Sequence, residues 1–157
     1  MPAGTAEGFN TVTPSLSVKN AAKAIETYKK AFGAKEISRM ESPDGSKKIM
    51  HAVIEIGNSK IMISDEFPNC PTATGTSFYV YMPDVDAAVK QAKSAGLSET
   101  MPPEDMFWGD RLGAVKDEFG INWSIATHKR EVSQEELEKG AREMMEKMKS
   151  AGNKKAA

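Results

Sequence analysis

The chain has 157 residues, of which 39% are hydrophobic and 27% charged, and its 21 Lys and Arg nearly balance 22 Asp and Glu. This composition indicates one soluble globular domain, or two small modules fused into one, that is long enough to bury a core without disulfides. The formal net charge of −1 argues against nucleic-acid and anionic-membrane partners. No apolar run reaches the ~20 residues of a membrane span.

The sequence also indicates a cellular compartment. Cys70 is the one cysteine, so no intrachain disulfide can form, which suits a reducing environment. The opening residues M-P-A-G-T-A-E lack the basic region and apolar run of a signal peptide. We therefore expect a cytoplasmic protein.

The chain contains an internal repeat, with one copy in residues 9–65 and the other in residues 76–130, joined by a Pro-containing linker at 66–75. Val18 aligns with Met82, and Asn20 with Asp84, at a constant offset of 64 residues. Each half is predicted to be a βαβββ module. Its elements are expected at 11–18, 21–32, 35–40, 48–56 and 60–64, then at 76–82, 85–95, 98–101, 111–116 and 121–127, with an irregular segment after 101. The fold class is therefore α+β, and two such modules must pair to bury their sheets, which creates a shared concavity.

Residues 131–157 are predicted to form a C-terminal helix and tail. Ser133 and Glu136 have the spacing of a capping box at the start of the helix. An apolar stripe follows at Leu137, Ala141, Met144, Met145 and Met148. A stripe of this kind docks on its own domain or on a second copy of the chain.

Strand alternation gives each predicted sheet one apolar face, which should cover a helix, and one mixed face. Hydroxyl groups, tyrosines, a histidine and a carboxylate on the mixed face are typical of a lined pocket, although a half-solvated sheet face is the alternative. The candidate ligand-binding residues of the mixed face are Thr13, Ser15, His51, Glu55, Met62, Ser77, Tyr79, Tyr81 and Ser124.

His51 is the candidate catalytic residue, because a histidine facing a pocket can act as a general base near neutral pH. The alternative is a structural histidine bonded to a neighbouring strand. Glu55 lies four positions away on the same strand, about 13 Å along it, so the two side chains cannot touch. His128, beside Lys129 and Arg130, is expected to be a solvated surface residue.

Two further candidate binding residues belong to the segment before the last hairpin. Trp108 lies in the irregular segment and could close the pocket or simply pack. Arg111 is expected to share the inner face with Gly113 and Val115, where it could hold an anionic group, although a salt bridge with a nearby acid is the alternative.

The duplicated plan, the stretch Y-K-K-A-F-G-A and the ending F-W-G-D-R-L-G-A-V-K-D-E-F-G-I-N-W-S-I-A-T-H resemble the vicinal oxygen chelate superfamily. This superfamily contains glyoxalases, bleomycin-resistance proteins and extradiol dioxygenases, and the nearer likeness is to its PhnB-like branch. The resemblance implies that both modules form one curved mixed sheet, the glyoxalase/bleomycin-resistance fold, with the C-terminal helix added. It also implies a homodimer with the ligand inside the curve.

The metal enzymes of this superfamily place His or Glu ligands at positions that correspond here to Thr13, Met62, Ser77 and Ser124. None of these side chains is a good ligand for a catalytic divalent ion. We therefore expect no metal and no other cofactor.

The predicted function is metal-independent binding of a small organic molecule, with sequestration of a drug or metabolite as the example from bleomycin-resistance proteins. Whether the protein is an enzyme stays open. The alternatives are a metal-dependent lyase or dioxygenase of the same superfamily, a metal-free acid–base enzyme using His51, and a structural dimer with a vestigial groove.

Overall fold

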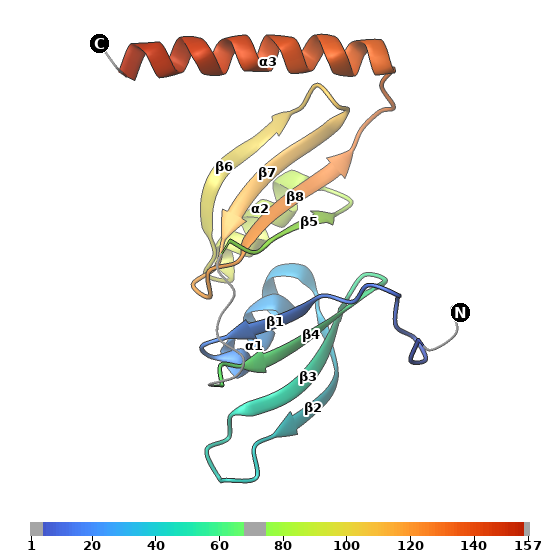
Figure 1. Cartoon of the computed structure of the whole chain (residues 1–157), viewed down its shortest axis with the longest axis vertical. Coiled ribbons are helices and arrows are strands. Elements are labelled where there is room, and N and C mark those ends of the chain that lie inside the picture. The colour runs from blue at the N-terminus through green and yellow to red at the C-terminus, as the bar shows by residue number, and fades with distance from the viewer. Residues whose placement is uncertain (1–4, 68–74, 156–157) are drawn as a thin grey trace.

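A computed structural model describes residues 5–67 and 75–155 of the chain (Figure 1). The first half contains β1 (Ser15–Val18), α1 (Ala21–Phe32), β2 (Lys35–Glu41), β3 (Ile49–Ile56) and β4 (Ser59–Asp65). The second half contains β5 (Ser77–Tyr81), α2 (Val85–Ser94), β6 (Ser98–Asp105), β7 (Asp110–Lys116) and β8 (Asn122–His128), and α3 (Gln134–Lys155) follows. Cys70 lies outside the described residues.

The strands form two mixed sheets with the same topology. Their orders are β1-β4-β3-β2 and β5-β8-β7-β6, and in each sheet only the first pair is parallel. This arrangement confirms the predicted α+β class. The described residues contain two sheets of four strands and not one continuous sheet, because no backbone ladder joins the two modules. Figure 1 shows β1 and β5 as the edge strands nearest the neighbouring module.

Both module helices begin at caps that the sequence predicts. The side chain of Asn20 accepts a hydrogen bond from the backbone N–H of Lys23, and that of Asp84 accepts one from Ala87. Gly33 ends α1 with a φ of 67°, a left-handed conformation that glycine adopts without strain.

The last strand of each module also supports the start of the helix in that module. In the first module Asp65 accepts hydrogen bonds from the N–H groups of Ala21, at 3.0 Å, and Ile49, at 2.7 Å. In the second module the hydroxyl of Thr127 accepts one from Val85 at 2.8 Å. The two contacts are equivalent within the repeat, although a carboxylate serves one copy and a hydroxyl the other.

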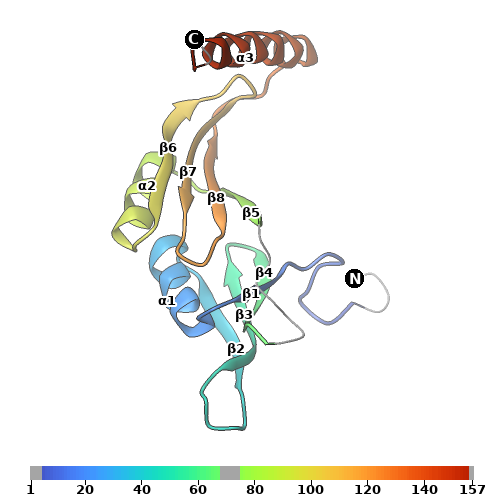
Figure 2. The same cartoon turned by 60° about the vertical axis from the view of Figure 1, so that its left-hand side comes forward.

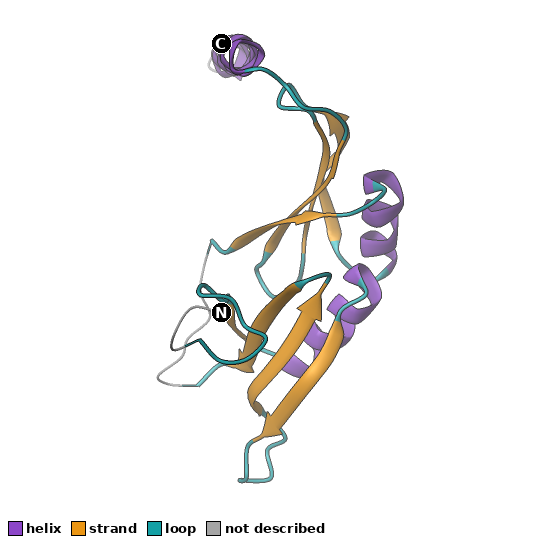
Figure 3. Ribbon diagram, turned by 90° about the vertical axis from the view of Figure 1, so that its right-hand side faces the viewer, coloured by secondary structure: helices purple, strands orange, loops and turns teal. Residues whose placement is uncertain are grey.

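The two modules are joined through their helices and a common core. Helices α1 and α2 lie side by side on one side of the sheets (Figures 2 and 3). The buried ring of Trp123 lies 4.4 Å from that of Phe32, 5.1 Å from Tyr28 and 5.0 Å from Phe78, measured between ring centroids. Because both helices cover the same side, each sheet turns its other face outward. We call this surface the open face.

Two predicted boundaries are wrong: the first strand begins at Ser15 and not at residue 11, and the short strand predicted at 98–101 is longer. Strand β6 continues from Ser98 to Asp105 and includes Pro102 and Pro103, where the sequence predicts an irregular segment. A proline cannot donate a backbone hydrogen bond, but β6 is the edge strand of its sheet, where that donor is not needed. The register with β7 shifts between Met101 and Glu104, so the strand passes the two prolines as a bulge.

Helix α3 lies across the end of the second module, beyond the β6–β7 loop (Figure 1). A Cβ atom at Gly140 would come within 2.5 Å of the Phe107 ring, so the helix rests on this loop at a position without a side chain. The predicted stripe is largely exposed, with Met144 at 38%, Met145 at 59% and Met148 at 67%. None of the helices in the described part of the chain is long and apolar enough to span a bilayer.

Candidate functional site

Burial shows which predicted site residues lie on the open face. In β1, Leu16 is buried while its neighbour Ser15 is exposed. In β5, Tyr79 and Tyr81 are exposed at 45% and 62%. The register pairs Ser15 with Met62, Ser77 with Asn122 and Tyr79 with Ser124, so these residues share a face across adjacent strands. His51 and Glu55 lie on the same face of β3 and are half-buried.

The first module leaves its candidates apart. His51 is paired across the sheet with Met40, while Glu55 lies between Lys35 and Lys60 in the register. Thr13 precedes β1, and its hydroxyl donates a hydrogen bond to the backbone oxygen of Asn10 at 3.0 Å. Among the described residues of this module, the register brings together only Ser15 and Met62 of the predicted site residues, and no side-chain hydrogen bond joins any two of them.

The prediction that Arg111 faces the inner side of the sheet is wrong. Its guanidinium donates two hydrogen bonds to Asp86 of α2, at 2.8 and 2.9 Å, and a third to Asp105 at 3.3 Å. Its strand neighbours Gly113 and Val115 also face α2, and a Cβ atom at Gly113 would meet Val89. Arg111 therefore lies on the helix-covered side, and the ion pair, which the sequence leaves as the alternative, is present.

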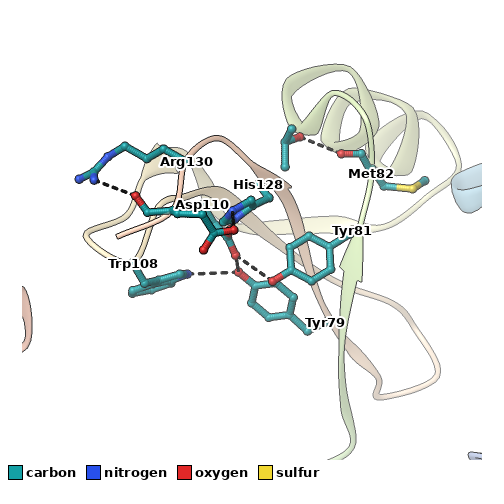
Figure 4. Close-up of polar contacts among 9 residues, drawn as sticks. Tyr79, Tyr81, Met82, Trp108, Asp110, His128 and Arg130 are labelled. Atoms are coloured by element: carbon teal, nitrogen blue, oxygen red, sulfur yellow. Dashed lines mark hydrogen bonds and ion pairs between the residues drawn. The ribbon is translucent and has the colours of Figure 1, made fainter. Parts of the chain in front are cut away.

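The second module gathers polar side chains around one buried carboxylate, and we call this group the Asp110 cluster (Figure 4). Asp110 is only 4% exposed. Its Oδ2 accepts hydrogen bonds from the hydroxyls of Tyr79, at 2.6 Å, and Tyr81, at 3.2 Å, while Oδ1 lies 2.7 Å from Nδ1 of His128. The indole N–H of Trp108 donates to the Tyr79 hydroxyl at 3.4 Å, which completes the cluster.

The prediction that His128 lies at the surface is confirmed, since its side chain is 45% exposed, but the sequence does not predict that both of its ring nitrogens contact carboxylates. The register pairs His128 directly with Asp110, so both side chains point to the open face of adjacent strands. The other ring nitrogen, Nε2, lies 3.0 Å from the carboxylate of Glu131. The imidazole thus lies between a buried and an exposed carboxylate.

The cluster shifts the pKa values of its members. Burial raises the pKa of Asp110, but the hydrogen bonds from Tyr79, His128 and Tyr81 outweigh it, so the net pKa falls below its usual range. The hydrogen bond to Asp110, followed by that to Glu131, raises the pKa of His128. Burial, followed by the bond to Asp110, raises the pKa of Tyr79 to about 12. The stable arrangement at neutral pH is therefore an ionised aspartate that accepts hydrogen bonds from the neutral tyrosines and from the imidazole.

Gly109 positions the cluster by joining two distant segments. Its φ is 95°, and a Cβ atom at this position would overlap the carbonyl oxygen of Arg130. The Gly109 carbonyl accepts hydrogen bonds from the N–H groups of Lys129 and Arg130, at 2.9 and 3.2 Å. This contact holds the end of β8, and with it His128, against the β6–β7 loop. A shallow hollow of about 250 Å³ adjoins the cluster, lined by Asp105, Met106, Gly109, Asp110, Lys129 and Arg130.

Paired βαβββ modules with helices on one side and open sheet faces on the other define a class of duplicated α+β proteins. The chain belongs to the Glyoxalase/Bleomycin resistance protein/Dioxygenase superfamily, whose family model matches residues 8–125. The protein Mb0911c of Mycobacterium bovis is 37% identical over 137 residues, which cover 81% of this chain and 89% of that protein.

Two solved structures show the same fold. Protein PA1353 from Pseudomonas aeruginosa is 26% identical, with a TM-score of 0.63 over 77% of this chain and 99% of that one. The PhnB protein from Bacillus cereus is 16% identical, with a TM-score of 0.60 over 75% and 99% of the two chains. The resemblance to this superfamily is thus confirmed, and the PhnB protein shares its fold.

The metal that many members of this superfamily use does not fit the residues present. The positions that the resemblance assigns to metal ligands carry Thr13, Met62, Ser77 and Ser124, which offer hydroxyl and thioether groups in place of imidazole or carboxylate. Across residues 5–67 and 75–155, no group of three or more His, Cys, Asp or Glu side chains is placed to hold a metal ion.

Proposed function

We propose that this protein binds a small planar organic molecule on the open face of its second module, without a metal, and sequesters it. The observation that carries the proposal is the anchoring of two exposed tyrosines on one buried carboxylate. Tyr79 and Tyr81 are 45% and 62% exposed, yet both hydroxyls are fixed by Asp110. The rings are therefore held in place and still open to a ligand.

The geometry of the aromatic groups supports this proposal. The rings of Tyr79 and Tyr81 are 5.2 Å apart and inclined by 55°, and Trp108 is joined to Tyr79 by its indole N–H. We call these three side chains the aromatic platform. Side chains that are already ordered lose little entropy when they bind, so a rigid platform favours ring contacts with a planar ligand. The superfamily includes bleomycin-resistance proteins, which supports sequestration as the role.

Calorimetric titration with uncharged planar aromatic compounds tests the proposal, and 2-naphthamide is a suitable first probe. Replacing Tyr81 by leucine removes a ring but leaves Asp110 bonded to Tyr79 and His128, so we expect binding to weaken about five- to tenfold. The matched control is Met40→Ala, which removes an exposed apolar side chain from β2 of the other module. Equal binding by wild type and Tyr81→Leu, or no binding by any compound of a broad panel, would reject the proposal.

Metal independence is tested separately. We expect purified protein to contain far less than one equivalent of Zn, Ni or Fe, and a chelator to leave the affinity for 2-naphthamide unchanged. A firmly held stoichiometric metal whose removal abolishes binding would instead support a lyase or dioxygenase.

A metal-free acid–base enzyme is the second candidate, and the pairing of His128 with Asp110 favours it. A buried aspartate on Nδ1 fixes the orientation of the imidazole, and Nε2 could exchange a proton with a ligand once the exposed Glu131 carboxylate turns away from it. His51, the residue that the sequence favours for this role, lies on the other module. Such an enzyme would lose turnover on His128→Gln and keep it on His51→Gln.

We also propose that the protein is a cytoplasmic homodimer, and α3 supports the dimer. Leu137, Ala141, Met144 and Met148 follow the alternating four- and three-residue spacing of a coiled-coil seam. Residues 134–144 carry four acidic and two basic side chains, whereas residues 145–155 carry one acidic side chain and four lysines. An antiparallel pair of α3 helices would bring these opposite charges together and cover the exposed methionines.

A further inference from the structure

The contact between His128 and Glu131 differs from the other contacts of the Asp110 cluster. Nε2 of His128 lies 3.0 Å from a carboxylate oxygen of Glu131, whose side chain is 96% exposed. Glu131 belongs to the short connection between β8 and α3. The outward nitrogen of an otherwise anchored histidine is therefore occupied by a carboxylate that lies almost entirely in solvent.

The two carboxylates on His128 are not equivalent. Asp110 is buried and accepts hydrogen bonds from Tyr79, Tyr81 and His128, so removing it would leave three donors without their acceptor. Glu131 can rotate away into water at little cost, because exposed ion pairs contribute little to stability. Another carboxylate can therefore replace Glu131 on Nε2 of His128, whereas Asp110 stays on Nδ1.

The imidazole itself favours an anion at this position. The groups that contact the imidazole in the described residues are Asp110 and Glu131, and their hydrogen bonds raise the pKa of His128. An imidazolium donates from both ring nitrogens, so it binds a carboxylate on each side. Arg130 lies next to Glu131, where its guanidinium donates to the Glu131 backbone oxygen at 3.3 Å and also pairs with the carboxylate of Glu136 at 3.2 Å.

The aromatic platform lies beside this position. Tyr79 and His128 bond to the two oxygens of the same carboxylate, at 2.6 and 2.7 Å, so one small molecule can reach both. We propose that Glu131 occupies the place of a ligand carboxylate, and that the preferred ligands are planar aromatic monocarboxylates. The ligand ring contacts the aromatic platform, and its carboxylate displaces Glu131 from Nε2 of His128. This inference rests on the proposed function and specifies its ligand class.

The test compares 2-naphthoate with its uncharged analogue 2-naphthamide by calorimetry at pH 6, in wild type and in Glu131→Gln. Because Glu131→Gln removes the carboxylate that competes with the ligand, it should tighten 2-naphthoate binding about tenfold and leave the affinity for 2-naphthamide unchanged. His128→Gln should abolish the preference for the acid over the amide. The matched control is Glu135→Gln, which removes an exposed carboxylate from the first turn of α3 and should change neither affinity.

The outcomes separate the two proposals. If 2-naphthamide binds at the platform but Glu131→Gln does not favour 2-naphthoate, the displacement is wrong and the proposed function stands. If Glu131→Gln tightens both compounds equally, Glu131 acts only by covering the platform, which also overturns the inference. A second measurement is independent of the platform: acetate should shift the His128 ring resonances at lower concentration in Glu131→Gln than in wild type, and equal titrations would contradict displacement.

Discussion

The hydroxyl of Tyr28 donates a hydrogen bond of 2.7 Å to Asp117 across 89 residues of sequence, and joins the helix of one module to the last hairpin of the other. Asp117 is 5% exposed and also accepts from the indole N–H of Trp123 at 3.0 Å. The backbone N–H groups of Phe119 and Ile121, both at 2.9 Å, complete its contacts. One carboxylate therefore fixes the β7–β8 turn and the contact between the modules.

Replacing Asp117 by alanine should be among the most destabilising single changes in the chain. It leaves four donors without their acceptor in a buried site, so we expect a loss of at least about 3 kcal/mol in the free energy of unfolding. Urea unfolding followed by tryptophan fluorescence measures it. Glu118→Gln is the matched control, because Glu118 is an exposed neighbour whose ion pair with Lys23 should contribute little. Similar losses in both variants would contradict this role of Asp117.

Gly140 and Gly152 are two glycines of α3 whose substitution by alanine should have different effects. Alanine normally stabilises a helix relative to glycine by about 1 kcal/mol. Nothing lies within 4 Å of a Cβ atom at Gly152, so Gly152→Ala should raise the helix content measured by circular dichroism. Gly140→Ala should instead displace Phe107 and change the fluorescence of Trp108, whose ring lies 5.0 Å from that of Phe107. If both substitutions only raise helix content, α3 does not rest on Phe107.

Titration of the Asp110 cluster should give a stability maximum on the acid side of neutrality. Because folding raises the pKa of His128 above its ordinary value of about 6.5, its contribution is complete below that pH and is lost as the pH rises through the folded-state pKa. Folding lowers the pKa of Asp110, so its contribution is present above about pH 4 and is lost as the pH falls further.

The pH dependence can be measured from the His128 ring resonances and from thermal unfolding. The folded-state pKa of His128 should exceed 6.5 and should fall in Asp110→Asn. The loss of thermal stability between pH 6 and pH 9 should be smaller in His128→Gln than in wild type. His51→Gln is the matched control and should retain the wild-type difference. An unshifted His128 pKa would show that the contact between Asp110 and His128 does not form.

Local patterns predict the helices and their caps well, because Asn20, Asp84 and Gly33 act within a few residues of their own positions. The Asp110 cluster could not be predicted in this way. Asp110 and His128 meet only through the β7–β8 register across 18 residues, and that register fixes which face each side chain takes. The sequence signal that could have identified the pair is a histidine at the end of the last strand, opposite an aspartate at the start of its hairpin partner.

Arg111 shows why the alternation of β7 is ambiguous. The strand reads D-R-L-G-A-V-K, with small residues at both Gly113 and Ala114, so neither face stands out as apolar. The structure predicts that Arg111→Gln leaves the affinity for 2-naphthamide unchanged and lowers thermal stability slightly, through loss of the contacts to Asp86 and Asp105. Calorimetry and thermal unfolding check this. A large loss of affinity would return Arg111 to the binding site.

The proposed dimer makes a prediction about the exposed stripe of α3. Met144 lies at the centre of the coiled-coil spacing, so Met144→Glu would place a charge inside an antiparallel helix pair, where its burial is costly. We expect the dimer to dissociate at least about tenfold more readily in sedimentation equilibrium. Ser150→Glu adds the same charge away from the stripe and is the control. A helix in a protein gains most of its stability from packing, so the helix content of Met144→Glu should also fall when the pair dissociates. A wild-type chain that sediments as a monomer, or a Met144→Glu variant that assembles like wild type, would show that α3 does not join two copies.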